Sequence, residues 1–243
     1  MSNPYQAPLD AENNSNQLNS GHQYSAAEIS QLYRCRMGAG LLLFVLCLVM
    51  IVFICGVIAG GLQLNTASFL KVIIGISILA AICSFIGNVM LLFSPERSGA
   101  KELFMFSFFL GIIAGVAPSI LSFMDVPIAA SLIANLILAI LPLFCLILFL
   151  TAWCNLGLFI NSYDVYRKMK RARTAFCCTL LLPLLGFILS KIPGLVGSNN
   201  ILGIILVGSV LLGAVISLIV FVINYGNGLT SFRKAVYEIM LKN

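Results

Sequence analysis

Long apolar stretches alternate with short polar breaks along most of the chain. A helix needs about 20 apolar residues to cross the hydrocarbon core of a bilayer. Six stretches have about that length: 38–62, 71–93, 103–124, 128–153, 175–193 and 201–224. The breaks carry turn-forming residues, as between Ser94 and Gly99. The pattern therefore predicts an all-α integral membrane protein, with a six-transmembrane-helix bundle over residues 38–228.

The first 37 residues differ from the rest of the chain. Most are polar, with many Asn, Gln and Ser, so they cannot bury enough surface to offset the entropy lost on ordering. Ser25 and Glu28 have the spacing of a capping box, and an apolar helix face follows at Ile29, Leu32 and Tyr33. We predict a disordered cytoplasmic tail over 1–37, ending in a short amphipathic helix at about 26–36 that leads into the first span.

The end of the chain also has an amphipathic pattern. Its apolar residues recur at helical spacing at Phe232, Ala235, Val236, Ile239 and Met240. The opposite face carries Arg233, Lys234, Glu238 and Lys242. We predict a cytoplasmic amphipathic helix over 229–243. Both terminal helices are interpreted as anchors at the ends of the bundle, and docking of a partner protein is the alternative.

The distribution of positive charge predicts the orientation. Short loops rich in Lys and Arg stay on the cytoplasmic side. One set of loops holds only Lys71 and Lys191, which leaves 12 of the 14 Lys and Arg residues for the opposite set and the two termini. Most aromatic residues with a polar end fall near that same side: Tyr33, Tyr163, Tyr166, Tyr225, Tyr237 and Trp153. We predict a protein of the cell (inner or plasma) membrane with both termini cytoplasmic.

Composition supports the membrane interpretation and argues against an enzyme. The chain is 60% apolar and 9% charged, with a mean hydropathy of +1.07, whereas soluble domains carry about a quarter charged residues. It has one His and 8 Cys, with no CxxC pair or Cys/His cluster. The sequence contains no GxSxG, HExxH or Walker lysine loop. We therefore expect no catalytic residues, no cofactor and no metal site.

The densest cluster of charge lies between the fourth and fifth apolar stretches. We call it the basic segment, and it comprises Arg167, Lys168, Lys170, Arg171 and Arg173. Beside a membrane, such cations attract anionic lipid headgroups at about 1 kcal/mol each. The alternative is a stop signal that only fixes the topology. Binding of nucleic acid is not expected, because one short stretch supplies no fold that reads a groove.

Polar residues within the apolar stretches are few, and none is ionisable well away from an end. This argues against a proton-coupled pump, which needs such groups at membrane depth. The candidate polar intramembrane residues are Asn88, Ser131 and Asn135. An amide in hydrocarbon needs a partner, so Asn88 and Asn135 are expected to face another helix. They either join helices together or line a small polar path with Ser131.

Small residues recur at a spacing of four, which lets two helix backbones approach closely. The candidate packing positions are Gly56, Gly60, Gly111, Gly115, Ser209, Gly213 and Ser217. Their partner is either another span of this chain or a second membrane protein, including another copy.

The opening Asn3-Pro4-Tyr5-Gln6-Ala7-Pro8 and its polar continuation resemble the start of bacterial multi-pass membrane proteins of unknown role, in which an Asn-Pro-Tyr-x-x-Pro leader precedes several spans. The resemblance covers about eight residues and carries no functional residue. It implies a bacterial inner-membrane protein.

Two functional hypotheses follow. The first is a non-enzymatic membrane protein that acts in membrane assembly, scaffolding or lipid interaction. Its partners are the lipid bilayer, anionic lipids at the cytoplasmic face, and a membrane protein or second copy. The second is a permease or channel for a small neutral or amphipathic solute.

Overall fold

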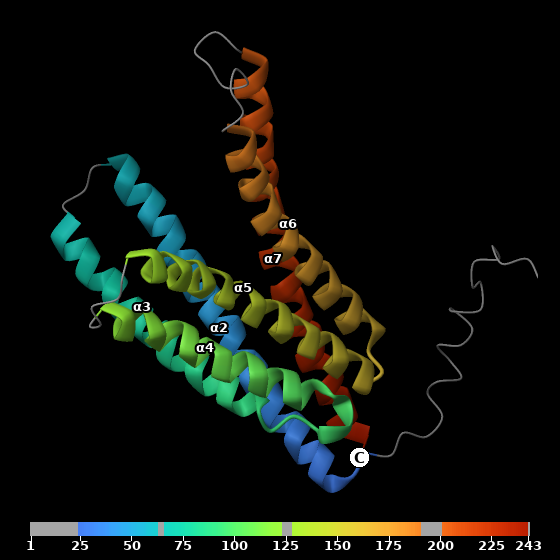
Figure 1. Ribbon diagram of the computed structural model, residues 1–243. Helices are drawn as coiled ribbons and strands as arrows, with labels where there is room; N and C mark the ends of the chain where they lie inside the picture. The colour runs from blue at the N-terminus through green and yellow to red at the C-terminus, as the bar shows by residue number, and fades with distance from the viewer. Residues whose placement is uncertain (1–23, 63–65, 123–127, 191–200, 243) are drawn as a thin grey trace, which may run out of the picture.

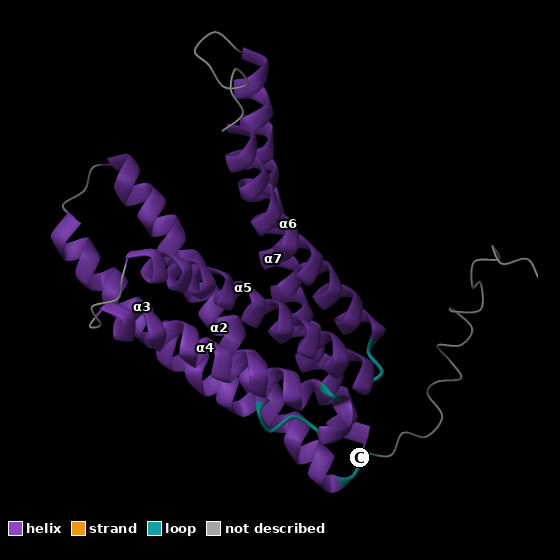
Figure 2. Ribbon diagram, viewed as in Figure 1, coloured by secondary structure: helices purple, strands orange, loops and turns teal. Residues whose placement is uncertain are grey.

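The computed structural model describes residues 24–62, 66–122, 128–190 and 201–242, and every regular element in these ranges is helical (Figures 1 and 2). The α-helices are α2 (Ala26–Leu62), α3 (Thr66–Leu91), α4 (Ala100–Ser122), α5 (Ile128–Phe159), α6 (Tyr163–Ser190) and α7 (Ile201–Lys242). A short 3₁₀ helix, η1 (Glu96–Ser98), lies between α3 and α4. The all-α prediction is confirmed for this part of the chain.

The helices form three antiparallel hairpins. The pairs α2–α3, α4–α5 and α6–α7 pack together, and α5 and α2 also contact α6 and α7 respectively. Figure 1 shows the hairpins close together at the end that carries the C-terminus, and spread apart at the other end, where α6 and α7 lead away from the rest.

The buried apolar side chains gather where the hairpins converge. We call this region the basal bundle: residues 25–42, 91–104, 149–172 and 225–240. Its largest fully buried side chains include Trp153, Phe232, Leu32, Leu150 and Met169. These residues come from α2, α5, α6 and α7, so the core joins segments far apart in the sequence.

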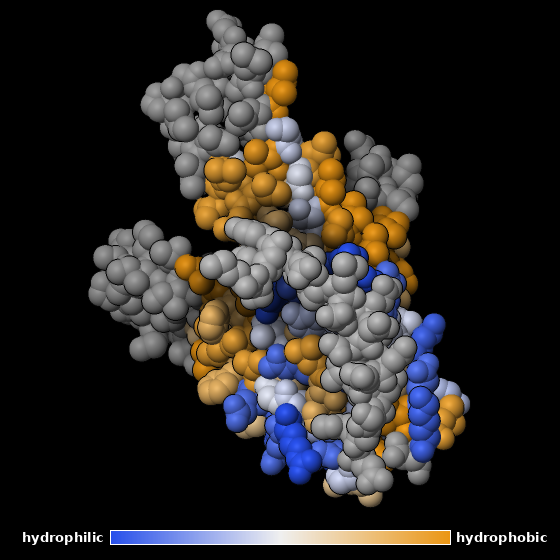
Figure 3. All heavy atoms as spheres, turned by 90° about the vertical axis from the view of Figure 1, so that its right-hand side faces the viewer, coloured by the Kyte–Doolittle hydropathy of each residue, from blue (hydrophilic) through white to orange (hydrophobic). Residues whose placement is uncertain are grey.

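The distal part, which comprises the remainder of the described helices, turns large apolar side chains outward. Phe53, Phe106, Leu181 and Leu212 are each more than 60% exposed. Figure 3 shows hydrophobic residues over much of the distal part and hydrophilic residues gathered toward the basal bundle. Such a surface suits contact with lipid tails, which are as apolar as the side chains themselves.

Five helices in the described ranges are long and apolar enough to cross a membrane. Their candidate spans are Ala26–Gly56, Lys71–Leu91, Ala100–Ala117, Ile140–Phe159 and Gly208–Lys242. The predicted fifth stretch, 175–193, is not among them. It lies in α6, whose first half carries the basic segment, and residues 191–193 fall outside the described ranges.

Three predicted boundaries differ from the structure. The amphipathic helices predicted at 26–36 and 229–243 are not separate elements, because α2 and α7 run without a break into the adjoining apolar stretches. The basic segment is not a loop, since α6 begins at Tyr163. In each case packing within the basal bundle holds the polar extension of the helix in place. The tail prediction for residues 1–23 lies outside the described ranges.

Candidate functional site

A tight turn between α5 and α6 positions the basic segment. Asn161 adopts the left-handed conformation, with φ 55°. The Ser162 N–H donates to the Gly157 carbonyl over 2.9 Å, and the Asn161 N–H donates to the Leu158 carbonyl over 3.0 Å. These two bonds are the Schellman pattern that ends a helix, and Asn tolerates the left-handed position better than most residues do. The chain therefore reverses in three residues and begins α6 directly.

Two of the five cations of the basic segment bind other parts of the basal bundle. The Lys168 ammonium donates to the Asp164 carboxylate over 2.7 Å and to the Ser231 hydroxyl of α7 over 2.8 Å. The Arg173 guanidinium donates to the Thr151 hydroxyl of α5 over 3.1 Å. These two side chains fasten α6 to its neighbours.

The other three cations, Arg167, Lys170 and Arg171, line a groove between α6 and α7 of about 550 Å³. We call it the α6–α7 groove. Tyr163, Tyr166, Thr174 and Asn224 join them in the lining, which also includes apolar residues of both helices, among them Ala175, Ile216 and Val220. The groove thus has both a cationic and an apolar part, and Lys168 and Arg173 are not among its lining residues.

The charge in the groove is mostly uncompensated. None of the described residues that line it has a carboxylate. The nearest ion pair joins Arg167 to Asp164 at 4.0 Å, and both side chains are about half exposed. The hydrogen bond from Lys168 holds the pKa of Asp164 below its ordinary value. This carboxylate is therefore ionised, and it already accepts a hydrogen bond from Lys168. The groove therefore presents net positive charge.

A second cavity, of about 830 Å³, lies between the α2–α3 and α4–α5 hairpins. Its lining is largely apolar and includes Asn88, Ser84 and Ser107. The Asn88 amide donates to the Ser84 carbonyl over 2.8 Å, within α3 itself rather than to another helix as expected. The side chains of Ser131 and Asn135 lie outside the described residues. Of the three predicted polar residues, the structure therefore describes the side-chain contacts of Asn88 alone.

Sequence reasoning missed the polar contact that does join two helices near this cavity. The Ser107 hydroxyl of α4 donates to the Cys145 carbonyl of α5 over 2.9 Å, and Ser107 is buried. A single Ser among many apolar residues gives no signal of its own in the sequence. The carbonyl that it binds is 38 residues away.

The predicted small-residue positions have different surroundings. A Cβ atom added at Gly56, Gly111 or Gly115 would meet nothing within 4 Å, so no helix packs closely there in the described structure. A Cβ at Gly213 would lie 3.3 Å from Leu182, which is a contact between α7 and α6. The remaining members of the set differ again: Ser209 is exposed, Ser217 lines the α6–α7 groove, and the side-chain surroundings of Gly60 lie outside the description.

Close helix approach occurs at other glycines, all in or beside the basal bundle. A Cβ at Gly38 would lie 2.8 Å from the Gly87 carbonyl oxygen, where α2 crosses α3. One at Gly157 would lie 2.9 Å from the Tyr166 nitrogen, beside the α5–α6 turn. These positions do not repeat at a spacing of four, so the small-residue pattern does not predict them.

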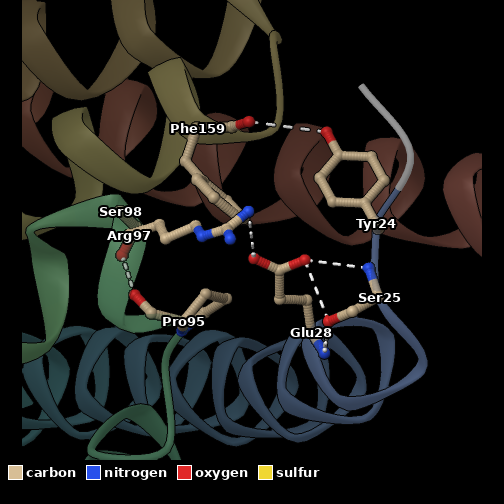
Figure 4. Close-up of polar contacts among 7 residues, drawn as sticks. All are labelled: Tyr24, Ser25, Glu28, Pro95, Arg97, Ser98 and Phe159. Atoms are coloured by element: carbon tan, nitrogen blue, oxygen red, sulfur yellow. Dashed lines mark hydrogen bonds and ion pairs between the residues drawn. The ribbon is translucent and has the colours of Figure 1, made fainter. Parts of the chain in front are cut away.

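Polar contacts fasten the start of α2 to the rest of the basal bundle (Figure 4). The predicted capping box forms: the Ser25 N–H donates to the Glu28 carboxylate over 2.8 Å, and the Glu28 N–H donates to the Ser25 hydroxyl over 3.2 Å. Glu28 also pairs with Arg97 of η1 at 3.9 Å, and the Tyr24 hydroxyl donates to the Phe159 carbonyl over 3.4 Å. This cluster joins three segments of the chain.

The described residues include no group of three or more His, Cys, Asp or Glu that could hold a metal ion. With its long apolar helices, its outward-facing apolar side chains and a cationic groove at one end, the described chain has the build of a helical membrane protein. Comparisons with family models, with curated proteins and with solved structures found no match to this chain.

Proposed function

We propose that the protein spans the cell membrane six times, with both termini in the cytoplasm, and acts without catalysis through contact with anionic lipids. The role is one of membrane assembly, scaffolding or lipid interaction. Two features support six spans: α6 pairs with α7 as a sixth long helix, and 12 of the 14 Lys and Arg residues remain on one side once Lys71 and Lys191 are set aside.

The observation that carries the proposal is the α6–α7 groove, where Arg167, Lys170 and Arg171 lie together with no carboxylate among the described lining residues. At the cytoplasmic surface of a bilayer, each such cation attracts anionic lipid by about 1 kcal/mol. Their long apolar stems can lie against the helices while the charged ends stay in the headgroup region. Tyr163 and Tyr166 suit the same interface, because each ring has an apolar body and a polar end.

The lipid preference can be measured directly. The full-length protein is extracted from bilayers of mixed phosphatidylcholine and phosphatidylglycerol, and the lipids that co-purify are counted. We expect an excess of phosphatidylglycerol over its share in the bilayer. Neutralising Arg167, Lys170 and Arg171 together to Gln should remove most of the excess. Neutralising Arg233, Lys234 and Lys242 on α7 removes the same amount of charge outside the groove. This variant should retain the phosphatidylglycerol excess. Co-purification of both lipids in proportion to the bilayer would contradict the proposal.

The orientation has a separate test. A reporter enzyme that is active only after export, fused after Asn243, should be inactive, and the same reporter in the 194–200 connection should be active. The opposite result would reverse the proposed topology and place the groove on the outer surface.

A permease or channel for a small neutral or amphipathic solute is the second candidate, and the cavity of about 830 Å³ favours it. Transport requires a continuous polar path, whereas the Asn88 amide group and the Ser107 hydroxyl donate to backbone carbonyls of the helices around the cavity. Solute flux into vesicles that Asn88→Leu abolishes without loss of folding would favour this candidate over the first.

A further inference from the structure

The α6–α7 groove follows one face of each helix. On α6 its lining residues include Arg167, Lys170, Arg171 and Cys178, which recur at intervals of three, one and seven. This spacing keeps them within one stripe of an α-helix. From the first to the last of them, α6 rises about 16 Å at 1.5 Å per residue. The groove is therefore elongated along the helix axis.

The second helix continues the same arrangement in the opposite direction. Ile216, Val220 and Asn224 of α7 are four residues apart and line the groove from the other side. Because α6 and α7 are antiparallel neighbours, the end of the groove near Arg167 lies toward Asn224, and the end near Cys178 lies toward Ile216. One end is cationic and polar, and the other is apolar.

This polarity selects the kind of ligand that fits. A free inorganic anion would satisfy the cations but would leave the apolar wall without a role. A wholly apolar ligand would leave Lys170 and Arg171, which line the groove with no carboxylate among the described lining residues, without a counter-charge. A volume of about 550 Å³ falls within the usual range for a small-molecule site. An amphipathic molecule with one anionic head and one apolar tail matches both ends.

We propose that the α6–α7 groove is a discrete binding site for one phospholipid with an anionic headgroup, with its phosphate against Arg167, Lys170 and Arg171 and an acyl chain along Val220 and Ile216. Arg presents paired donors that match phosphate oxygens. The Lys170 nitrogen lies 5.7 Å from the centre of the Tyr166 ring. Tyr166, which also lines the groove, therefore helps to hold the Lys170 ammonium in place. The proposal rests on the anionic-lipid function above, and adds one site with one occupant.

Native mass spectrometry of the full-length protein in neutral detergent tests this site. The probe is dioleoyl phosphatidylglycerol, and dioleoyl phosphatidylcholine is the uncharged-headgroup control. We expect one tightly bound phosphatidylglycerol per chain. Replacing Arg167, Lys170 and Arg171 with Gln should weaken its binding about a hundredfold, because three contacts of about 1 kcal/mol are lost.

The apolar wall is tested with the charges intact. Val220→Trp fills the groove from α7 and should abolish the bound lipid. Val215→Trp on the same helix lies outside the lining and should leave it bound. If Val220→Trp fails to fold, as judged by size-exclusion chromatography, Cys178→Phe fills the groove from α6 and serves instead.

The possible outcomes separate the two proposals. If the filled-groove variants keep the bound lipid while the charge variant loses it, the discrete site is wrong and the general lipid preference stands. If inorganic phosphate displaces the lipid at a similar concentration, a soluble anion is the occupant and the lipid site is wrong. If the unmodified protein binds both lipids equally, the site and the proposed function are both wrong.

Discussion

The basal bundle and the distal part of the same helices are built in opposite ways. In the basal bundle, Trp153 lies with its ring centre 5.0 Å from that of Phe232, 5.6 Å from that of Phe104 and 6.3 Å from that of Phe149. In the distal part, the hairpins diverge and large apolar side chains face outward. A region that meets water must bury its apolar surface in its own interior, whereas lipid tails can surround a region within a bilayer. The difference is the one expected of a helical protein that meets water at one end and lipid at the other.

Removal of the central aromatic side chain should give the largest effect. Trp153→Ala empties a fully buried site in the basal bundle and should cost about 3–5 kcal/mol of unfolding free energy. Phe106→Ala removes a ring that is 63% exposed on α4 and should cost less than about 1 kcal/mol. Equilibrium unfolding in mixed detergents measures both. Equal losses would remove the distinction between the two regions.

Glycine substitutions should sharpen the comparison at the level of the backbone. Gly38→Ala would place a methyl group 2.8 Å from a carbonyl oxygen of α3, and because backbone cannot yield cheaply, we expect a loss of about 1–3 kcal/mol. Gly111→Ala meets open space and should be neutral, or stabilising by up to about 1 kcal/mol through helix propensity. The same unfolding measurement applies. Destabilisation by Gly111→Ala would instead reveal a close partner for α4 in the membrane.

The smallest effect concerns the ion pair at the start of α6. Lys168 lowers the pKa of Asp164 in the folded state, so the contribution of this carboxylate is present well above its ordinary pKa of 3.8 and disappears as pH falls through the lower, folded value. Both side chains are partly exposed, which limits the contribution to about 0.5 kcal/mol. Asp164→Asn should show this loss near neutral pH and match the unmodified protein in strong acid.

A control for that prediction is the same substitution in a Lys168→Met background. There Asp164→Asn should have a smaller effect, because Lys168, the largest cause of the lowered pKa, is absent, while Ser231 and Arg167 remain. An undiminished loss in this background would show that Asp164 acts mainly through those other contacts.

Hydropathy was sufficient to predict the all-helical class and the positions of the long helices, because a run of about 20 apolar residues is typical of a helix that crosses a membrane. It did not reveal that the polar ends continue the same helices. α6 starts at Tyr163 because Asn161 ends α5 within a single turn, and one Asn among many is a weak signal. If the basic segment is predicted as part of a helix, the spacing of Arg167, Lys170 and Arg171 indicates that these three side chains share one face of that helix.

Other features of the site depend on contacts that no local pattern reports. Lys168 and Arg173 bind Ser231 and Thr151, which lie 63 and 22 residues away in the sequence. The partner of Asn88 was closer: Ser84 lies one turn earlier on the same helix. Its carbonyl could have been recognised as a local acceptor, since polar side chains often bond the backbone one turn back.

The length of α7 has a mechanical consequence. This helix has 42 residues without interruption, or about 63 Å at 1.5 Å per residue, while the hydrocarbon core is about 30 Å thick. If α7 crosses the bilayer as proposed, about half of its length lies beyond the lipid tails. Phe232 and Val236, toward its C-terminal end, are fully buried. Over such a projection, a tilt of about 10° swings the tip through about 5 Å. In the proposed arrangement, a change in bilayer thickness that tilts α7 would thus strain its contacts at Phe232 and Val236.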